Sequence, residues 1–273
     1  MKKVVVITGA TSGIGKALTE SFADSDYIVY AGYRNPDYER DLKKISSNVV
    51  PFSIDMEKNS IIDGAAILIK RQVEHVDILI NAAGCVMAGA MENMPYEKLK
   101  KQFDVNTFSH IRFTQKLSDV LEGSKVINIS SMASFGIFPF IAPYSASKRA
   151  LDILFSALEI EANHKFKVIS VKPGVIATPL WEKSVEINQD CIEKDKAYEK
   201  EMKFMAKNAM RNASSGLPVS AVVKLIKDIA NLDKPKSSYT IGIDAKFAEF
   251  ASKLPQDWVN FLIELGMKKK GLR

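Results

Sequence analysis

Residue types that bind metals are scarce in this chain. Among its 273 residues there are two cysteines and three histidines. The cysteines, Cys85 and Cys191, lie far apart, and the histidines are scattered, so neither type has the spacing of metal ligands. We therefore expect no metal site. Two isolated cysteines also favour a reducing compartment, and we predict a cytoplasmic protein.

Long apolar runs are missing too. No stretch approaches the roughly 18 uninterrupted apolar residues that a membrane-spanning helix needs. The N-terminal "MKKVVVITGATSGIG" begins like a secretory signal, with two lysines before an apolar run. That run is short and leads into glycines instead of a cleavage site. We therefore expect a buried strand there and a soluble globular chain.

The chain has a positive net charge but little clustering of basic residues. A net charge of +6 favours an anionic partner. Lysines nevertheless alternate with acids, as in "EINQDCIEKDKAYEKEMKF", which is typical of a solvated helix face. We predict no nucleic-acid partner. The terminal "GMKKKGLR" is either a peripheral anchor on anionic lipid or a solvated basic end, and the second interpretation is favoured.

Short apolar runs alternate with amphipathic helical patterns along the chain. Runs that are apolar on both faces and separated by helices predict a parallel sheet covered on both sides, a doubly wound α/β (Rossmann) fold of about seven strands. No repeat or linker marks a second domain, so we expect one domain over residues 1–273. The runs are "KVVVITG", "YIVYAGY", "VVPFSI", "VDILINAAG", "KVINISS", "FKVISVKPG" and "SSYTIG".

Two segments depart from this alternation. About residues 179–213 form a long charged helical stretch after the sixth strand, which is either a lid over the sheet edge or an additional surface helix. About residues 244–273 form a C-terminal extension.

A glycine-rich loop joins the first strand to the first helix in "VVVITGATSGIGKAL". Gly9 allows a sharp turn, Gly13 allows the backbone to approach a pyrophosphate, and Gly15 allows tight packing of the helix. The helix N-terminus offers free amides to an anion. In this position the pattern predicts dinucleotide binding, the alternative being a purely structural turn.

The end of the second strand indicates which dinucleotide binds. An NAD site usually has an acid there, but Ala31, Gly32 and Tyr33 are followed by Arg34. A guanidinium can form paired hydrogen bonds with the 2′-phosphate of NADP. Arg34 thus predicts NADP(H), unless it is an ordinary surface arginine.

Tyr144 and Lys148 in "YSASK" are one helical turn apart and can point into one pocket. A phenol has a pKa near 10. A cation roughly 4 Å away, at an effective dielectric of about 20, would lower that pKa by about three units and make the phenol a usable acid. The alternative is an ordinary aromatic–lysine pair on a helix.

The chain resembles the short-chain dehydrogenase/reductase family over nearly its whole length. The resemblance is in particular to NADP-dependent members that act on steroids, retinoids, acyl-dihydroxyacetone phosphates and similar lipophiles. The resemblance rests on several motifs in order. They are "TGATSGIG", Asp55 after the third strand, "NAAG", "VN", "NISS", "YSASK" and "PGVIAT".

The resemblance implies a role for each of four residues. Tyr144 exchanges a proton with the substrate oxygen, and Lys148 binds the nicotinamide ribose and lowers the pKa of the phenol. Ser131 polarises the carbonyl, with Ser130 as the alternative serine. Asn106 holds a water in the proton relay, unless it is a core amide or marks a helix kink.

The resemblance also implies a cofactor site for NADP (NADPH). Asp55 binds the adenine amino group unless it is a loop acid, "NAAG" lines the ribose and nicotinamide, and "PGVIAT" holds the carboxamide. The expected cofactor-binding residues are Gly9, Thr11, Ser12, Gly13, Ile14, Gly15, Arg34, Asp55, Met56, Asn81, Ala82, Ala83, Gly84, Tyr144, Lys148, Pro173, Gly174, Val175, Ile176 and Thr178.

The expected activity is hydride transfer between NADPH and a lipophilic ketone or aldehyde, as in a carbonyl reductase, with oxidation of a secondary alcohol as the reverse reaction. The alternatives are a 3-oxoacyl-[acyl-carrier-protein] reductase and a non-catalytic NADP(H)-sensing regulator. Family members commonly form homodimers or homotetramers, and we expect a homo-oligomer. An apolar substrate pocket is expected from Phe135, Ile137, Phe138, Phe140, Ile141, Leu180, Trp181 and Val185.

Overall fold

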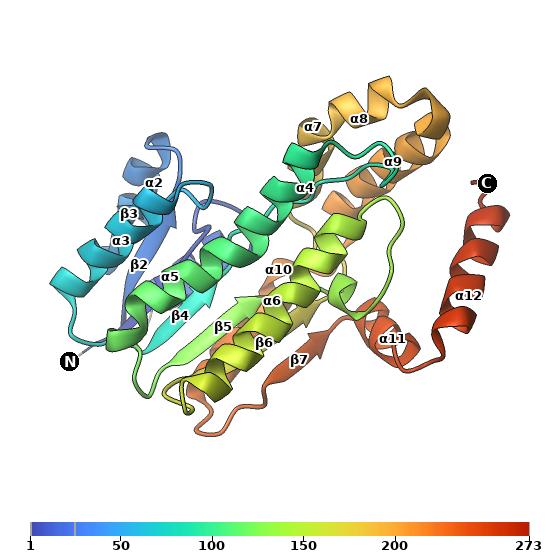
Figure 1. Cartoon of the computed structure of the whole chain (residues 1–273). Coiled ribbons are helices and arrows are strands. Elements are labelled where there is room, and N and C mark those ends of the chain that lie inside the picture. Colours follow the sequence, from blue (N-terminus) through green and yellow to red (C-terminus); the bar gives the residue numbers. More distant parts are fainter. Residues whose placement is uncertain (1, 25, 273) are drawn as a thin grey trace.

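The computed structural model describes residues 2–24 and 26–272, so the predicted domain ends at residues 1 and 273 lie outside the described residues. Seven parallel strands form one sheet in the order β3-β2-β1-β4-β5-β6-β7 (Figure 1). The seven strand predictions and the doubly wound fold are confirmed. The strands are β1 Lys3–Ile7, β2 Tyr27–Tyr33, β3 Val49–Ser53, β4 Ile78–Asn81, β5 Lys125–Ile129, β6 Lys167–Pro173 and β7 Ser238–Ile241.

The strand order reverses between β1 and β4, where the connections leave the sheet in opposite directions. In sheets of this kind, ligands bind outside the carboxyl ends of the strands at such a switch point. The glycine-rich loop after β1 and the "NAAG" segment after β4 therefore meet at the same edge.

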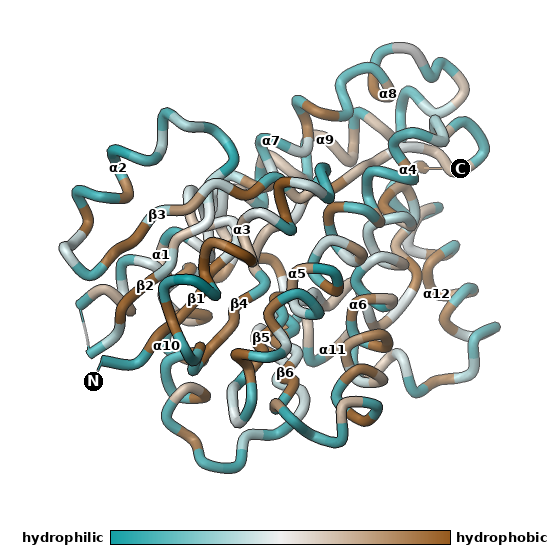
Figure 2. The backbone as a smooth tube through the Cα atoms, turned by 60° about the vertical axis from the view of Figure 1, so that its left-hand side comes forward, coloured by the Kyte–Doolittle hydropathy of each residue, from teal (hydrophilic) through white to brown (hydrophobic). Residues whose placement is uncertain are grey.

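Helices cover both faces of the sheet. One face packs against α1 (Gly13–Ala23) and α10 (Val219–Asn231), and the other against α3 (Asn59–Gln72), α5 (Ser109–Leu117) and α6 (Ala142–Glu161). The polar helix α2 (Asp37–Ile45) follows β2 and buries a single leucine, Leu42. Figure 2 shows the hydrophobic strands inside this covering.

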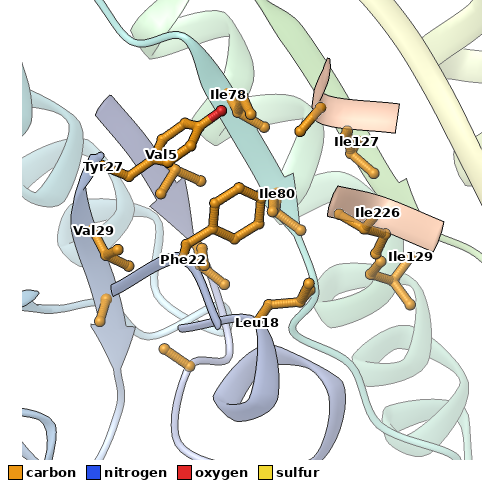
Figure 3. Packing of buried hydrophobic residues seen from close by; sticks show 14 of the residues in the cluster. Val5, Leu18, Phe22, Tyr27, Val29, Ile78, Ile80, Ile127, Ile129 and Ile226 are labelled. Atoms are coloured by element: carbon orange, nitrogen blue, oxygen red, sulfur yellow. The ribbon is translucent and has the colours of Figure 1, made fainter. Parts of the chain in front are cut away.

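Successive residues of β1 face opposite sides of the sheet and so belong to two different hydrophobic cores. Val5 faces the core shared with Phe22 of α1, whereas Val6 faces the core shared with Phe113 of α5. Figure 3 shows Phe22 and Leu18 against Val5 and Ile80. Burial of a side chain of this size stabilises the fold by about 1.5–3 kcal/mol.

The amphipathic stretch between β4 and β5 consists of several helical pieces. Helix α4 (Tyr96–Phe103) passes into a π-helical turn, η1 (Asp104–Phe108), before α5, and a 3₁₀ turn, η2 (Ser118–Val120), follows α5. A π-helical turn adds one residue to the winding and often marks a functional position. Asn106 lies in this turn.

The stretch predicted as a long helical segment from about residue 179 is also divided. It contains α7 (Leu180–Ile187), α8 (Gln189–Lys194), the turn η4 (Lys196–Tyr198) and α9 (Glu199–Ser215). Its two ends lie side by side, because the Ala177 amide donates to the Leu217 carbonyl (3.0 Å) and the Leu217 amide donates to the Val175 carbonyl (2.8 Å).

The C-terminal extension forms α11 (Ile243–Ala251) and α12 (Gln256–Lys269), and Figure 1 shows α12 on the outside of the molecule beside α11. Within residues 2–24 and 26–272, none of the helices combines the length and the apolar composition that crossing a bilayer requires.

Candidate active site

Backbone angles and close contacts require glycine at several positions of the loop after β1. Gly9 has a φ of +68°, and a Cβ there would lie 2.8 Å from the Cα of Ala83. A Cβ on Gly15 would lie 2.2 Å from the carbonyl oxygen of Gly9. Gly13 also has a positive φ, +53°, and faces Thr178. The loop is therefore drawn tightly between β1, the "NAAG" segment and the loop after β6.

Two residues outside the predicted set hold the "NAAG" segment. The Thr8 hydroxyl accepts hydrogen bonds from the amides of Ala82 (3.1 Å) and Ala83 (3.2 Å). On the other side, His110 Nε2 lies 2.9 Å from the Ala83 carbonyl oxygen. Burial lowers the pKa of His110 to about 3, so the ring is neutral and Nε2–H donates. His110 falls four residues after Asn106, a spacing that could have pointed to it.

Tyr144 and Lys148 are both buried on the inner face of α6, as their spacing predicts. Lys148 Nζ donates to the carbonyl oxygen of Ile129 at the end of β5 (2.7 Å). Burial lowers the pKa of Lys148 to about 8, and the carboxylate of Asp152, one turn further along α6, acts in the opposite direction.

The pKa of Tyr144 differs from the sequence expectation. Burial raises it above the ordinary value, a hydrogen bond from Ser131 lowers it, and burial is the larger influence. The prediction that Lys148 sets a lowered phenol pKa is therefore wrong for this structure. The physical reason is that Tyr144 lies in an apolar surrounding, while the Lys148 ammonium is directed at the Ile129 carbonyl.

Ser131 is placed next to Tyr144, whereas Ser130 follows β5 directly and bonds to β6. Ser131 Oγ accepts from the Ala133 amide (3.1 Å), which leaves its hydroxyl proton available to Tyr144. The Ser130 amide donates to the Val171 carbonyl (2.8 Å), and its side chain is buried. The geometry favours Ser131 over Ser130.

Asn106 combines the two alternatives considered for it. It lies in the π-helical turn, and its side-chain amide is buried. Asn106 Oδ1 accepts from the Cys85 amide (2.9 Å), while Nδ2 donates to the Cys85 carbonyl (3.0 Å) and to Ser147 Oγ (3.3 Å). A Cβ on Gly84 would lie 3.4 Å from Asn106 Oδ1 and 3.7 Å from Lys148 Nζ, so Gly84 leaves space in front of both groups.

Arg34 is at the end of β2 but is engaged with an acid. Its side chain is 69% exposed, and NH1 lies 3.2 Å from Glu57 Oε1. Glu57 also lies 3.0 Å from Lys101 Nζ of α4. Two cations therefore flank the predicted 2′-phosphate position, with an acid between them. Neither Glu57 nor Lys101 belongs to the predicted set, because their approach depends on three separate segments.

Asp55 makes contacts within the loop after β3, and Asn81 bonds from the end of β4 to the neighbouring strand β5. Asp55 Oδ1 accepts from the Glu57 amide (3.0 Å), and Oδ2 lies 3.5 Å from Lys58 Nζ. Asn81 Nδ2 donates to Asn128 Oδ1 (2.8 Å) in the interior. Met56 is buried in the core beneath this edge, and Ile14 is partly buried behind the glycine loop.

The loop after β6 lies at the same edge of the sheet, beside the glycine loop. A Cβ on Gly174 would lie 1.9 Å from Asp244 Oδ1, and Asp244 Oδ2 accepts from the Val175 amide (2.7 Å). The Ile176 carbonyl accepts from Trp181 Nε1 (2.7 Å). Thr11 and Ser12 are half-buried in the glycine loop, and Lys183 of α7 lies 3.4 Å from Ser12 Oγ. Asp244 is a further residue that sequence reasoning missed.

Apolar side chains surround Tyr144. Val86 and Ala133 form a buried cluster with it, and Phe138, Ile141 and Leu180 pack against that cluster. Three of the eight predicted wall residues are thereby placed beside Tyr144.

Two other predicted wall residues are engaged differently. The Phe140 ring packs against Tyr198 at 6.0 Å between centroids, and the Phe135 ring lies under Lys172 Nζ at 4.6 Å. Lys172 in turn lies 3.1 Å from Asp152 Oδ2, and both side chains are buried. Phe140 therefore packs against η4 and Phe135 against a lysine of β6, in addition to any substrate contact.

The residues fit a dinucleotide. The positive φ angles of Gly9 and Gly13, the N-terminus of α1 and the space left by Gly84 form a cradle along the switch point. Among the described residues, no three His, Cys, Asp or Glu side chains gather in a way that could hold a metal ion. Fold and site together define a dinucleotide-binding α/β protein with the Ser–Tyr–Lys group of an oxidoreductase.

Comparison with known proteins identifies the family. Residues 3–189 match the family described as "short chain dehydrogenase". The NADPH-dependent 3-dehydrocapnine reductase of Ornithobacterium rhinotracheale is 30% identical over 250 residues, 88% of each chain. The NADPH-dependent 1-acyldihydroxyacetone phosphate reductase of Saccharomyces cerevisiae is 27% identical over 98% of this chain and 91% of its own. The chain belongs to the short-chain dehydrogenase family.

A solved structure shows the same fold. A short-chain dehydrogenase from Streptomyces avermitilis superimposes with a TM-score of 0.78 and 23% identity, over 100% of this chain and 99% of its own.

Proposed function

We propose that the protein is an NADP(H)-dependent oxidoreductase that reduces the carbonyl group of a lipophilic ketone or aldehyde to the alcohol. The observation that carries this proposal is the arrangement of Ser131, Tyr144 and Lys148. The phenol is buried, hydrogen-bonded by Ser131, and one helical turn from a buried ammonium.

NADPH, when bound, would supply the hydride that the carbonyl carbon takes up. Tyr144 delivers its phenolic proton to the carbonyl oxygen, and its raised pKa keeps that proton in place at neutral pH until the oxygen becomes basic. The Ser131 hydroxyl donates to the same oxygen and orients it. Lys148 holds the ribose hydroxyls, and Asn106, fixed by its bonds to Cys85, orients a water behind Lys148.

Several features support NADP(H) as the cofactor. Arg34 and Lys101 place two cations at the end of β2, where an NAD-binding acid would stand. Both relatives described above carry NADPH dependence in their names. We assign the pyrophosphate to the glycine loop, with Lys183 as an additional cation beside Ser12.

The apolar surrounding of Tyr144 supports a lipophilic substrate. Phe138, Ile141 and Leu180 offer contact surface close to the phenol. The name of the yeast relative includes an acyl group, which is consistent with an apolar chain near the reacting carbonyl.

We also propose that the chain is one domain with residues 179–213 as a lid. The lid is fastened at several points to the segment between β4 and α4. Asn188 Nδ2 donates to the Val86 carbonyl (2.8 Å), and Lys98 Nζ of α4 donates to the Ile187 carbonyl (2.9 Å). Leu180 of α7 packs against the cluster around Tyr144, which supports a role for this segment in excluding water.

A homo-oligomer is the further part of this proposal. Apolar side chains are exposed on η1 and on the outer face of α6, and they include Phe108, Ile153, Leu154 and Ile160. An exposed apolar face of this kind marks an interaction site. Members of the family pair through the corresponding helices, so we propose that this face meets a second copy.

The test is the oxidation of NADPH, followed by its absorbance, against ketosteroids, retinals, long-chain aldehydes and acetoacetyl thioesters, with NADH in parallel. We expect turnover of an apolar carbonyl compound with NADPH. In Tyr144→Phe we expect kcat to fall about a hundredfold to ten-thousandfold while NADPH still binds. Activity confined to acetoacetyl thioesters would establish the carrier-protein reductase instead. NADPH binding without turnover of any substrate would indicate a sensor.

A further inference from the structure

The outer faces of α11 and α12 expose large apolar side chains in regular order. Within each helix these side chains recur every three or four residues, so they form one stripe per helix. Their exposed fractions range from 38% for Leu265 to 90% for Ile243. We call the two stripes together the C-terminal apolar face. It consists of Ile243, Phe247, Phe250, Trp258, Phe261, Leu262 and Leu265.

Lysines continue both stripes. Lys246 follows Ile243 by three residues and Lys269 follows Leu265 by four, so both share the side of the apolar residues, and Lys253 lies just beyond the end of α11. They are exposed.

The acids of these helices lie off the stripes or at an edge. Asp244 is turned inward to the Val175 amide. Glu249 and Glu264 each precede a stripe residue by one position, about 100° around the helix, and Asp257 lies at the edge of the α12 stripe, four residues before Phe261. The C-terminal apolar face therefore combines apolar side chains with positive charge.

We propose that this face docks onto the surface of an anionic phospholipid bilayer. Tryptophan, phenylalanine and leucine enter the region between headgroups and acyl chains, while lysines at the edge reach the phosphates. A second copy fits less well, because a two-fold contact sets the face against itself and gathers the lysines of both copies in one contact. The charge pattern of the face thus selects lipid as its occupant.

The face is connected to the loop after β6 at one end and to α9 at the other. Asp244 in the first turn of α11 holds Val175 in the loop after β6. At the other end of α12, Lys270 Nζ lies 5.5 Å from the centroid of the Phe204 ring of α9, and Leu272 is buried. Helix α12 therefore runs from α11 to a helix of the lid, on the outside of the molecule (Figure 1).

A bilayer on this face would lie against the lid and the cofactor loop. This gives a lipophilic substrate a route from the membrane to Tyr144, an implication that rests on the proposed function. The docking itself does not rest on that function.

The test is co-sedimentation of the full chain with vesicles. We expect binding to vesicles of equal parts phosphatidylcholine and phosphatidylglycerol, weaker by about tenfold or more on vesicles of phosphatidylcholine alone or in high salt. The double variant Phe247→Ser/Phe261→Ser should remain in the supernatant. The matched control is Ile67→Ser/Leu68→Ser on α3, which removes two exposed apolar residues of another face and should bind like the wild type.

A second measurement reports the contact directly. Trp258 is 66% exposed, so its fluorescence should shift to the blue when the mixed vesicles are added. Trp258→Phe should lose that shift and still sediment, because phenylalanine keeps the apolar contact. Lys246→Gln/Lys269→Gln should weaken sedimentation while the circular dichroism spectrum stays native.

Two results would overturn the proposal. One is a wild type that stays in the supernatant with the mixed vesicles. The other is a Phe247→Ser/Phe261→Ser variant that sediments with the vesicles as the wild type does. If the particle mass of that variant in light scattering is also smaller, the face is a contact between copies. The oxidation of NADPH with a water-soluble carbonyl compound reports separately on the proposed function and should be equal in all these variants.

Discussion

The Tyr144 phenol and the Lys148 ammonium respond to the same burial in opposite directions. Burial raises the pKa of Tyr144 and lowers that of Lys148 to about 8, because each group is shifted towards its neutral form. A protonated phenol suits the delivery of a proton to a carbonyl oxygen. The lysine must remain charged to serve the ribose, so we expect turnover to fall as the pH rises through about 8.

Removal of the buried charge should stabilise the fold. The folded-state pKa of Lys148 lies below its ordinary value of 10.5, so the unfolded chain holds the proton more tightly. The cost is fully present below about pH 8 and disappears as the pH rises towards 10.5. We expect Lys148→Met to raise the free energy of unfolding by about 1–3 kcal/mol near pH 7 and to abolish turnover.

The measurement is thermal unfolding of both proteins near pH 7 and near pH 10. The gap in Tm between Lys148→Met and the wild type should shrink at the higher pH. A gap of unchanged size would show that lost packing contacts, and not the buried charge, set the difference.

Glu57 should limit the affinity for NADPH, since it occupies Arg34 and Lys101. We expect Glu57→Gln to lower the KM for NADPH by roughly threefold to tenfold and to leave the KM for NADH unchanged. Arg34→Ala should raise the KM for NADPH by about tenfold or more. Because the pairs are exposed, the free energy of unfolding should change by less than about 1 kcal/mol. Equal responses to the two cofactors would refute Arg34 as a phosphate ligand.

At the scale of elements, the side chain of Lys98 joins α4 to the proposed lid, residues 179–213. Lys98 Nζ donates to the Ile187 carbonyl, pairs with Asp190 and lies 3.5 Å from Cys191 Sγ. Its stem is largely buried, so the charge is held between the two segments and not in solvent.

We expect Lys98→Met to loosen the proposed lid, to raise the KM for the carbonyl substrate by about tenfold and to speed proteolysis within residues 179–213. The KM for NADPH should change little. Lys100→Met is the matched control on the same helix, because Lys100 pairs with the neighbouring Asp104 on the surface. If both variants behave alike, general loss of charge on α4 explains the effect and the lid contact does not.

At the scale of the whole molecule, the outer face of α6 should set the oligomeric state. Ile153 is 55% exposed there, and a glutamate at this position would place a charge inside the proposed contact between copies. We expect Ile153→Glu to shift the protein to monomers in sedimentation velocity. Ile67→Glu on α3 is the control and should leave the assembly intact. A wild type that already sediments as a monomer would refute the pairing.

The sequence alone predicts those features of the fold and of the site that depend on a single segment. Each strand was visible as an apolar run, and the turn at Gly9 and the shared face of Tyr144 and Lys148 followed from local spacing. The structure adds contacts between distant segments. Glu57 approaches Arg34 from the neighbouring strand's loop, and Asp244 reaches Val175 across 69 positions. Periodicity tells which side of a helix is polar, but it does not name the partner.

The pKa of Tyr144 was mispredicted for a related reason. Spacing showed that a cation lies one turn away, but the depth of the phenol depends on Val86, Ala133 and Leu180, which come from three other segments. Desolvation is a property of the assembled surroundings, so a pairwise estimate from two residues omitted the larger influence.

The backbone pairing of Ala177 and Leu217 has a consequence for how this protein can change. The chain leaves the sheet edge after Thr178 and returns at Leu217, which pairs with the backbone of residues 175–177. The intervening helices therefore form an insertion whose two ends are adjacent. Insertions, deletions or a transplanted segment there need not disturb the strands or the glycine loop. The choice of substrate could thus diverge by exchange of one contiguous piece while the redox machinery stayed as it is.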